Sequence, residues 1–340
     1  MRLVSFARPG TSGHALGAWE DDTILHLAIA AAIFEVPERD RTLLATMETL
    51  LADWDRGITL TRDVAARARA LAGARVMSGG SAGGSDRAAS LVSAVRFPIA
   101  DVTLLSPVAQ PPSVRDFYAF ETHVKNARAR RGLTVPPEWY EAPVFYFSNP
   151  GALIGHDAPV TRPASTQALD YELEIACVIS KKARNVAPDD WRSVVAGFTI
   201  LNDWSARDVQ RKEMAVGLGP AKGKDFATSL GPAIVTVDEF DDRLSAAPGA
   251  GERVDLAMGA RVNGKTLSRA NAKDMHFTFG QMIARASADV YLFPGDVIGS
   301  GTAGNGCLLE LGQETHPWLQ PGDEVTLEIE RLGALSNRIA

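Results

Sequence analysis

The chain has few cysteines, no long apolar run and no basic stripe. Its 340 residues include only two cysteines, Cys177 and Cys307, with no Cys-x-x-Cys pair and no His/Cys ligand spacing. This scarcity argues against a disulfide framework and against structural zinc, and it favours a reducing, cytoplasmic location. The run from Ile24 to Phe34 contains His26 and is far shorter than the roughly 20 residues that span a bilayer, so no membrane partner is expected.

Targeting and nucleic-acid signals are also missing. The first residues do not combine a basic segment with an uninterrupted apolar core, so no signal peptide is predicted. The net charge is −6, and the densest basic cluster, from Lys125 to Arg131, is too short for a duplex footprint. We expect it to form a solvated helix face or an anion-binding lid, and we expect no nucleic-acid partner.

What is present is the composition of an ordinary globular protein whose length suggests two domains. We assign residues 1–105 to a small N-terminal domain with a strand from Arg2 to Phe6 and helical stretches at Ala28–Phe34, Arg41–Trp54 and 62–73. The glycine- and serine-rich stretch at 78–85 is typical of a flexible loop. Residues 106–340 follow a proline-rich linker and alternate short strand patterns with turn signals, which predicts one β-rich domain.

Within that second domain, three local patterns predict particular elements. Val262 to Lys265 contains Asn-Gly, which favours a type I′ hairpin turn. Pro188 and the acidic residues after it favour a helix from Asp189 to Ala196. An apolar strand from Phe198 to Leu201 precedes Asp203, which is either a carboxylate ligand or the N-cap of the next turn.

Glu172 and Glu174 are the most informative residues of the sequence. Alternation predicts a strand with Tyr171, Leu173 and Ile175 on one face and the two glutamates on the other. Two carboxylates about 4 Å apart repel each other by about 4 kcal/mol at an effective dielectric constant of about 20. A divalent cation would remove this cost, and oxygen ligands suit Mg²⁺, Ca²⁺ or Mn²⁺. The alternative is an edge strand whose glutamates face solvent.

Two further segments carry chemically active side chains. The segment from Asp116 to His123 holds a carboxylate, Tyr118 and a histidine, and histidine is the commonest general base. Lys224 lies in a glycine-punctuated loop, where it could face a substrate carboxylate or an enolate.

Gly299 to Gly304 matches the pattern Gly-x-Gly-x-x-Gly of dinucleotide-binding folds. That motif requires a helix to begin directly after it, so that the helix N-terminus meets the pyrophosphate. Here the residues from Asn305 to Gly312 indicate a turn into another strand. The sequence therefore argues against nucleotide binding at this loop.

Together, these segments resemble the fumarylacetoacetate hydrolase superfamily, and a fumarylacetoacetase-like bacterial member in particular. The resemblance rests on DYELE, NDWSARDVQ, GKDFATSLGP, LFPGDVIGSGTAGNG and the DFY…H segment, in the family's order over about residues 112–330. It implies an α+β, mostly β fold, in which a small α+β N-terminal domain precedes a mixed β-sandwich roll. It also implies a homodimer.

The resemblance also implies a role for each matching residue. The implied metal ligands are Asp116, Glu172, Glu174 and Asp203. The implied catalytic residues are His123 as general base, Glu310 in a Leu-Leu-Glu-Leu strand as its partner, and Lys224. The implied substrate-binding residues are Tyr118, Tyr146, Gln210 and Thr302. The implied cofactor is a divalent metal, Mg²⁺ before Mn²⁺ or Ca²⁺.

The expected reaction is hydrolysis of a C–C bond in a 1,3-diketo acid such as an acylpyruvate. Smaller relatives place a glutamate three residues after the histidine, but that position here is Asn126, so pairing with Glu310 fits fumarylacetoacetase better. A family arginine after the histidine has no single counterpart, which leaves Arg128, Arg130 and Arg131 as candidates. The alternatives are a keto-acid decarboxylase, tautomerase or hydratase on the same fold, or a non-catalytic metal- or small-molecule-binding protein.

Overall fold

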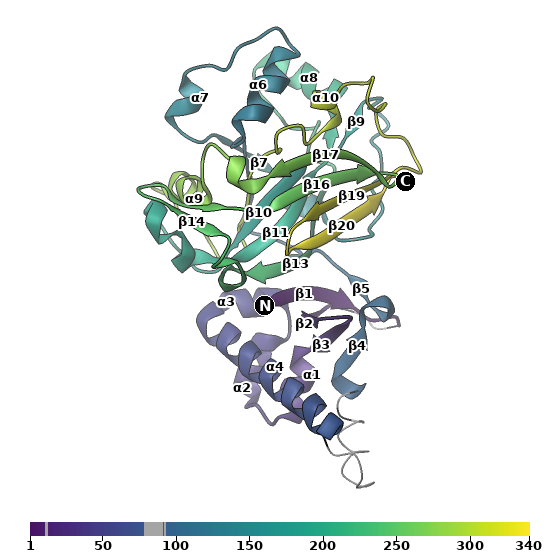
Figure 1. Cartoon of the computed structure of the whole chain (residues 1–340), viewed down its shortest axis with the longest axis vertical. Coiled ribbons are helices and arrows are strands. Elements are labelled where there is room, and N and C mark those ends of the chain that lie inside the picture. Colours follow the sequence, from purple (N-terminus) through teal and green to yellow (C-terminus); the bar gives the residue numbers. More distant parts are fainter. Residues whose placement is uncertain (11–12, 78–90, 92) are drawn as a thin grey trace.

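The computed structural model describes residues 1–10, 13–77, 91 and 93–340. The loop predicted at residues 78–85 lies outside the described residues. Figure 1 shows a smaller N-terminal part below a larger C-terminal part, with β1 directly beneath β13.

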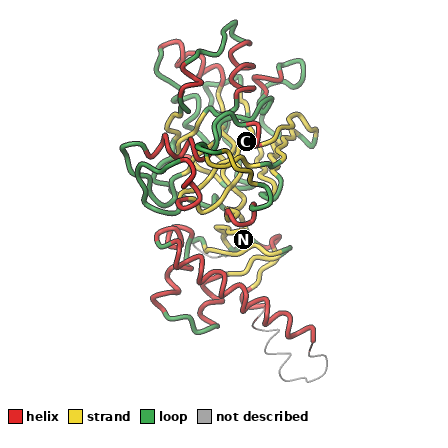
Figure 2. The backbone as a smooth tube through the Cα atoms, turned by 60° about the vertical axis from the view of Figure 1, so that its left-hand side comes forward, coloured by secondary structure: helices red, strands yellow, loops and turns green. Residues whose placement is uncertain are grey.

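The N-terminal part packs helices against one side of a few antiparallel strands (Figure 2). Its strands are β1 (Arg2–Ala7), β2 (Ala15–Glu20), β3 (Thr23–His26), β4 (Arg96–Pro98) and β5 (Thr103–Leu104). Its helices are α1 (Leu27–Ile33), α2 (Glu38–Arg41), α3 (Met47–Ala52) and α4 (Trp54–Met77), with the 3₁₀ segments η1 (Thr42–Leu44) and η2 (Ile99–Asp101). The stretch predicted as one helix from Arg41 to Trp54 is interrupted, because Thr46 forms a capping box with Thr49 and so begins α3.

One large mixed sheet runs through the whole molecule in the order β4-β3-β2-β1-β13-β11-β10-β18-β6-β7. Its C-terminal strands are β6 (Val114–Phe117), β7 (Phe145–Ser148), β8 (Leu153–Ile154), β10 (Leu173–Ile179), β11 (Val195–Asp203), β13 (Thr228–Thr236) and β18 (Val297–Gly299). Because β1 pairs with β13, the sheet continues across residue 105. The division of the chain at that residue stays a prediction.

A second, antiparallel sheet packs against the C-terminal strands in the order β17-β16-β19-β20. It contains β16 (Ala257–Val262), β17 (Lys265–Asn271), β19 (Glu324–Ile329) and β20 (Gly333–Arg338). Leu173 and Ile175 of β10 share one buried core with Met258 and Leu327 of this sheet. The predicted hairpin joins β16 to β17, and Asn263 and Gly264 at its tip both have positive φ.

Short elements complete the C-terminal part. Two small ribbons pair β9 (Leu169–Asp170) with β12 (Ser205–Ala206) and β14 (Leu244–Ala247) with β15 (Gly251–Val254). The helices are α6 (Glu121–Ala129), α7 (Glu138–Glu141), α8 (Arg207–Val216), α9 (Phe279–Ser287) and α10 (Leu308–Leu311), and the 3₁₀ segments are η3 (Pro150–Ala152), η4 (Pro188–Val194), η5 (Val237–Phe240) and η6 (Ala272–Asp274). The helix predicted from Asp189 to Ala196 is wrong in type and end: the chain forms 3₁₀ turns, and β11 begins at Val195 because that residue enters the sheet core.

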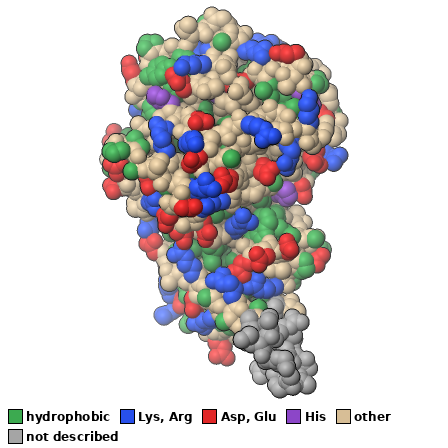
Figure 3. Space-filling model, in the orientation of Figure 1, with side chains coloured by type: hydrophobic (Ala, Val, Ile, Leu, Met, Phe, Trp, Pro, Cys, Tyr) green, Lys and Arg blue, Asp and Glu red, His purple; other side chains and the backbone are tan. Residues whose placement is uncertain are grey.

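The predicted α+β fold with a sandwich-like C-terminal part is confirmed. Cys177 and Cys307 are free thiols, and both are buried. Among the described residues, no helix is both long and apolar enough to cross a bilayer. On the face in Figure 3, acidic and basic side chains are interspersed.

Candidate active site

Neighbouring strands of the large sheet place the predicted metal ligands together. Asp116 in β6 pairs with Gly299 in β18, which in turn pairs with Ala176 in β10. Asp203 ends β11, the strand on the other side of β10. Glu172 and Glu174 are 4% and 0% exposed, which rules out a solvated strand face.

Asp116, Glu172 and Glu174 each offer an oxygen within 4.8 Å of the others. The fourth predicted ligand, Asp203, connects to this group through Lys224. Nζ of Lys224 donates to Oε2 of Glu172 at 2.5 Å and to Oδ2 of Asp203 at 2.6 Å.

The glycines of the Gly-x-Gly-x-x-Gly run make room for these carboxylates. A β-carbon on Gly299 would lie only 2.6 Å from Oδ1 of Asp116. The amide of Gly301, at a φ of +78°, donates to both Asp116 and Glu174 at 3.2 Å. The loop thus uses its glycines to approach the protein's own carboxylates.

Glu172 is the best compensated of the four carboxylates. Besides Lys224, it accepts a hydrogen bond from Nη2 of Arg207 at 2.7 Å, and its backbone amide donates to Asn202. Burial alone would raise the pKa of Glu172, but Lys224 and Arg207 outweigh it and hold this pKa well below its ordinary value.

Asp116 and Glu174 lack such compensation. Burial, followed by the charge of Asp203, raises the pKa of Asp116 well above its ordinary value. Burial, followed by the charges of Asp116 and Glu172, does the same for Glu174. Oε1 of Glu174 and Oδ1 of Asp203 are buried without a hydrogen-bond partner. Two partnerless oxygens within an all-carboxylate group fit a hard divalent cation, which the four side chains would hold.

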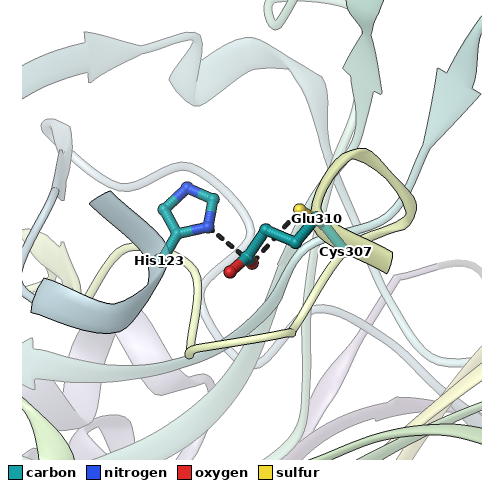
Figure 4. A group of neighbouring side chains, drawn as sticks. All are labelled: His123, Cys307 and Glu310. Carbon is teal, nitrogen blue, oxygen red and sulfur yellow. Dashed lines mark hydrogen bonds and ion pairs between the residues drawn. The ribbon is translucent and has the colours of Figure 1, made fainter. Parts of the chain in front are cut away.

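His123 and Glu310 form a buried pair beside this cluster. His123 lies in α6, and its Nδ1 is 2.7 Å from Oε2 of Glu310, although 187 residues separate them in the sequence (Figure 4). The charge of His123 helps to lower the pKa of Glu172. The structure thus forms the His123–Glu310 contact that the resemblance implied, while the catalytic role of the pair stays a prediction.

Glu310 is held by several donors at once. Its Oε1 accepts from the amide of Asn305 at 2.9 Å and from Nδ2 of Asn126 at 3.0 Å, and its Oε2 accepts from the amide of Gly306 at 3.2 Å. Burial would raise the pKa of Glu310, but His123 and these donors lower it overall. Glu310 is therefore fixed as an anion.

The strand predicted around Glu310 is wrong. Leu308 to Leu311 form the short helix α10, because Asp170 accepts hydrogen bonds from the amides of Leu308 and Leu309 at 2.8 and 3.0 Å. Apolar alternation cannot reveal a cap supplied from 138 residues away. Since Asp170 already takes these amides, the helix that the sequence missed does not offer them to a phosphate.

Three of the four predicted substrate-binding residues contact side chains of this centre. The hydroxyl of Tyr146 donates to Oδ2 of Asp203 at 2.5 Å. The ring of Tyr118 lies edge-on to His123 with 5.3 Å between centroids, and burial raises its pKa to about 12. Thr302 is buried and belongs to the segment that follows β18 and precedes α10 in the chain. Oε1 of Gln210 accepts a hydrogen bond from Arg207. Their contact with substrate stays a prediction.

The three candidate arginines differ in how they are occupied. Arg130 donates to the carbonyl of Glu310 and pairs with Glu314, and Arg128 donates to the carbonyl of Thr134. Among the described residues, the side chain of Arg131 donates to the carbonyl of Ala127 and to the sulfur of Met214, at 3.3 and 3.9 Å.

Sequence reasoning missed the roles of Asp170 and Arg207. Nε of Arg207 donates to Oδ2 of Asp170 at 2.8 Å, while its Nη2 binds Glu172. A buried ion-pair chain therefore links the carboxylate cluster to the helix that carries Glu310. Asp170 belongs to the motif DYELE and Arg207 to the motif NDWSARDVQ. Their membership of these motifs was the signal available in the sequence.

Comparison with known proteins agrees with this geometry. The family model described as fumarylacetoacetate hydrolase C-terminal matches residues 113–340. The chain belongs to the fumarylacetoacetate hydrolase family. It is also 30% identical to a mitochondrial oxaloacetate tautomerase of Homo sapiens, with 100% of this chain and 91% of that protein covered.

Solved structures similar to this chain include enzymes that catalyse reactions other than tautomerisation. A maleylpyruvate hydrolase of Sphingobium sp. SYK-6, in complex with manganese(II) and pyruvate, matches with 25% identity, a TM-score of 0.65 and coverage of 100% of this chain and 99% of that one. A 5-carboxymethyl-2-hydroxymuconate delta-isomerase of Mycobacterium smegmatis matches with 25% identity, a TM-score of 0.63 and the same coverage. The chain is thus a member of a family of enzymes that includes hydrolases, isomerases and tautomerases.

Proposed function

We propose that the protein is a divalent-metal-dependent hydrolase that cleaves a C–C bond in a 1,3-diketo acid such as an acylpyruvate. The observation that carries this proposal is the contact between Nδ1 of His123 and Glu310. A fixed anion on Nδ1 favours the imidazolium that forms when Nε2 takes a proton, as hydrolysis requires of a general base.

The side chains then have distinct tasks. A cation held by Asp116, Glu172, Glu174 and Asp203 would supply the Lewis-acid charge that polarises the diketo oxygens. His123 removes a proton from water, whose oxygen attacks the carbonyl carbon distal to the acid's 2-oxo group. The C–C bond breaks, its electron pair leaves as the enolate of the 2-oxo acid, and a proton completes the products. The ammonium of Lys224 stabilises the negative charge as it develops.

We propose Arg131 as the residue that binds the substrate carboxylate. It follows α6, the helix that carries His123. The charges of Arg131 and Arg128 both act on Tyr118 beside the base, and that of Arg131 acts more strongly. Arg128 and Arg130 donate to carbonyl oxygens at 2.5 and 2.8 Å, and Arg130 also pairs with Glu314. Arg131 donates to a carbonyl oxygen at the longer distance of 3.3 Å. A guanidinium can bind a carboxylate through two parallel hydrogen bonds.

A substrate panel tests the proposed reaction. The Mn²⁺-loaded protein should release pyruvate and an equal amount of the matching carboxylic acid from short-chain acylpyruvates. Failure to release either product from any acylpyruvate of the panel, under conditions where metal is bound, would refute hydrolysis.

A second candidate is keto–enol tautomerisation of oxaloacetate. It is favoured by the 30% identity to an oxaloacetate tautomerase over the full chain. Tautomerisation changes the enol absorbance but breaks no C–C bond and releases no carboxylic acid. The same panel separates the two activities when it includes oxaloacetate and its products are quantified.

A further inference from the structure

A third side chain completes a group of metal-binding atoms at the base. Sγ of Cys307 lies 3.5 Å from Oε2 of Glu310, the oxygen that also contacts Nδ1 of His123 (Figure 4). One ligand atom from each of the three residues lies within 4.8 Å of the other two. This group contains nitrogen, sulfur and oxygen, whereas the predicted metal ligands at the neighbouring cluster are all carboxylates.

The spacing of these atoms approaches that of a tetrahedral zinc site. With Zn–S near 2.3 Å and Zn–N and Zn–O near 2.0–2.2 Å, ligand atoms lie roughly 3.3–3.7 Å apart. The Sγ–Oε2 distance of 3.5 Å already falls in this range. The Nδ1–Oε2 distance of 2.7 Å must open by roughly 0.6 Å to reach it.

Other residues already hold the ligands in place. Glu310 is oriented by the amides of Asn305 and Gly306 and by Asn126, and such outer contacts strengthen metal sites. Its helix is fixed in turn by Asp170. Only the imidazole and the thiol therefore need to adjust around a preset carboxylate.

We propose that His123, Cys307 and Glu310 form a second, inhibitory metal site that takes a soft divalent cation such as Zn²⁺. On binding, the Cys307 thiol releases its proton to solvent and becomes a thiolate ligand. The neutral imidazole binds through the lone pair of Nδ1 and carries its proton on Nε2. An Nε2 that already carries a proton cannot accept one from water, so the bound cation stops the base. Only this inhibition, and not the binding, rests on the proposed hydrolysis.

Cadmium provides a direct probe, because a Cd²⁺–thiolate bond absorbs in the ultraviolet and a Cd²⁺–carboxylate bond does not. The full chain, with the carboxylate cluster first saturated with Mg²⁺, is titrated with CdCl₂. We expect a thiolate band that saturates at one equivalent per chain and that ZnCl₂ removes by competition.

Matched cysteine variants locate the site. Cys307→Ser keeps a hydrogen-bond donor for Glu310 but should lose the band. It should weaken zinc inhibition by at least the roughly tenfold that the loss of a mere outer contact of a metal ligand costs. Cys177→Ala, which removes the other buried thiol on β10, should leave both unchanged. His123→Ala, measured for binding alone, should weaken the band.

Two results would overturn the inference: no thiolate band at one equivalent, or zinc inhibition of equal strength in Cys307→Ser, which would place the zinc at the carboxylate cluster. If the Mg²⁺-loaded protein cleaves no diketo acid before cadmium is added, and the thiolate band still forms on titration, the proposed hydrolysis is refuted and the metal site stands.

Discussion

Glu174 and Glu310 are both buried glutamates of the same site, yet their surroundings differ. Glu310 accepts hydrogen bonds from two backbone amides and Asn126 and contacts His123, and its pKa is lowered. Glu174 accepts one hydrogen bond from Gly301, has one oxygen without a partner, and its pKa is raised.

The difference separates two uses of a buried carboxylate. A carboxylate surrounded by hydrogen-bond donors is stable as an anion and can orient a histidine without a metal ion. A buried carboxylate surrounded by other carboxylates destabilises the fold unless a cation binds to it. The site therefore combines a preorganised base with a cluster that metal binding should complete.

The largest expected effect is that of metal removal. Dialysis against a chelator should abolish turnover of an acylpyruvate, because the carboxylate cluster then lacks the charge that polarises the substrate. Added Mn²⁺ or Mg²⁺ should restore it. Full activity in protein shown by elemental analysis to be metal-free would contradict metal dependence.

Removing the base should have the next largest effect. His123→Ala should lower kcat by roughly 10²–10⁴-fold, the usual contribution of a positioned general base. Glu310→Gln should cost less, since it keeps a polar contact while losing the charge. Calorimetry should show that both variants bind Mn²⁺ with unchanged affinity. Loss of Mn²⁺ binding in either variant would mean that His123 and Glu310 are needed to hold the carboxylate cluster in its metal-binding arrangement.

A variant of Arg131 separates the binding of the substrate carboxylate from the proton transfer at His123. Arg131→Gln should raise KM about tenfold or more with little change in kcat, because a charge-assisted hydrogen bond contributes about 1.5–3 kcal/mol. Lys125→Gln is the control: it removes an exposed charge of α6 that already pairs with Glu121. Equal KM values for the two variants would remove Arg131 from the carboxylate-binding role.

Stability in the absence of metal tests the two glutamates against each other. Glu310→Gln should lower the free energy of unfolding by about 1–3 kcal/mol, because it disturbs a satisfied network. Glu174→Gln should leave it unchanged or raise it, since it removes an uncompensated charge. Denaturant unfolding of both metal-free variants measures this. Mn²⁺ should then raise the Tm of Glu310→Gln only. Similar losses of stability in the two variants would show that Glu174 and Glu310 are equally well compensated in the metal-free protein.

The smallest effect is expected at His26, which N-caps α1 through its contact with the amide of Ile29. Burial, followed by the charge of Arg8, lowers the pKa of His26 to about 4 from 6.5. Between these values the unfolded chain binds a proton that the folded chain does not, so stability should fall as the pH falls from 6.5 to about 4. His26→Asn keeps a capping oxygen. In urea unfolding at several pH values, His26→Asn should therefore show a smaller change in the free energy of unfolding between pH 6.5 and about 4. An unchanged pH dependence would mean that other groups cause it.

The sequence predicted the parts of the site that local pattern controls. Alternation placed Glu172 and Glu174 on one face of a strand, and the family motifs supplied Asp116, Asp203, His123 and Glu310, which the structure brings close together. It failed where distant residues decide local structure. Asp170 turns the stretch around Glu310 into a helix, and Arg207 compensates Glu172, and neither effect is visible within a short window of sequence.

Product analysis in ¹⁸O-labelled water tests the central claim most directly. Hydrolysis by the Mn²⁺-loaded protein should place one ¹⁸O atom in the carboxylic acid released from an acylpyruvate, at a rate that His123→Ala lowers by roughly 10²-fold or more. Release of unlabelled acid, or loss of the enol signal with no acid released, would contradict water attack assisted by His123 and Glu310.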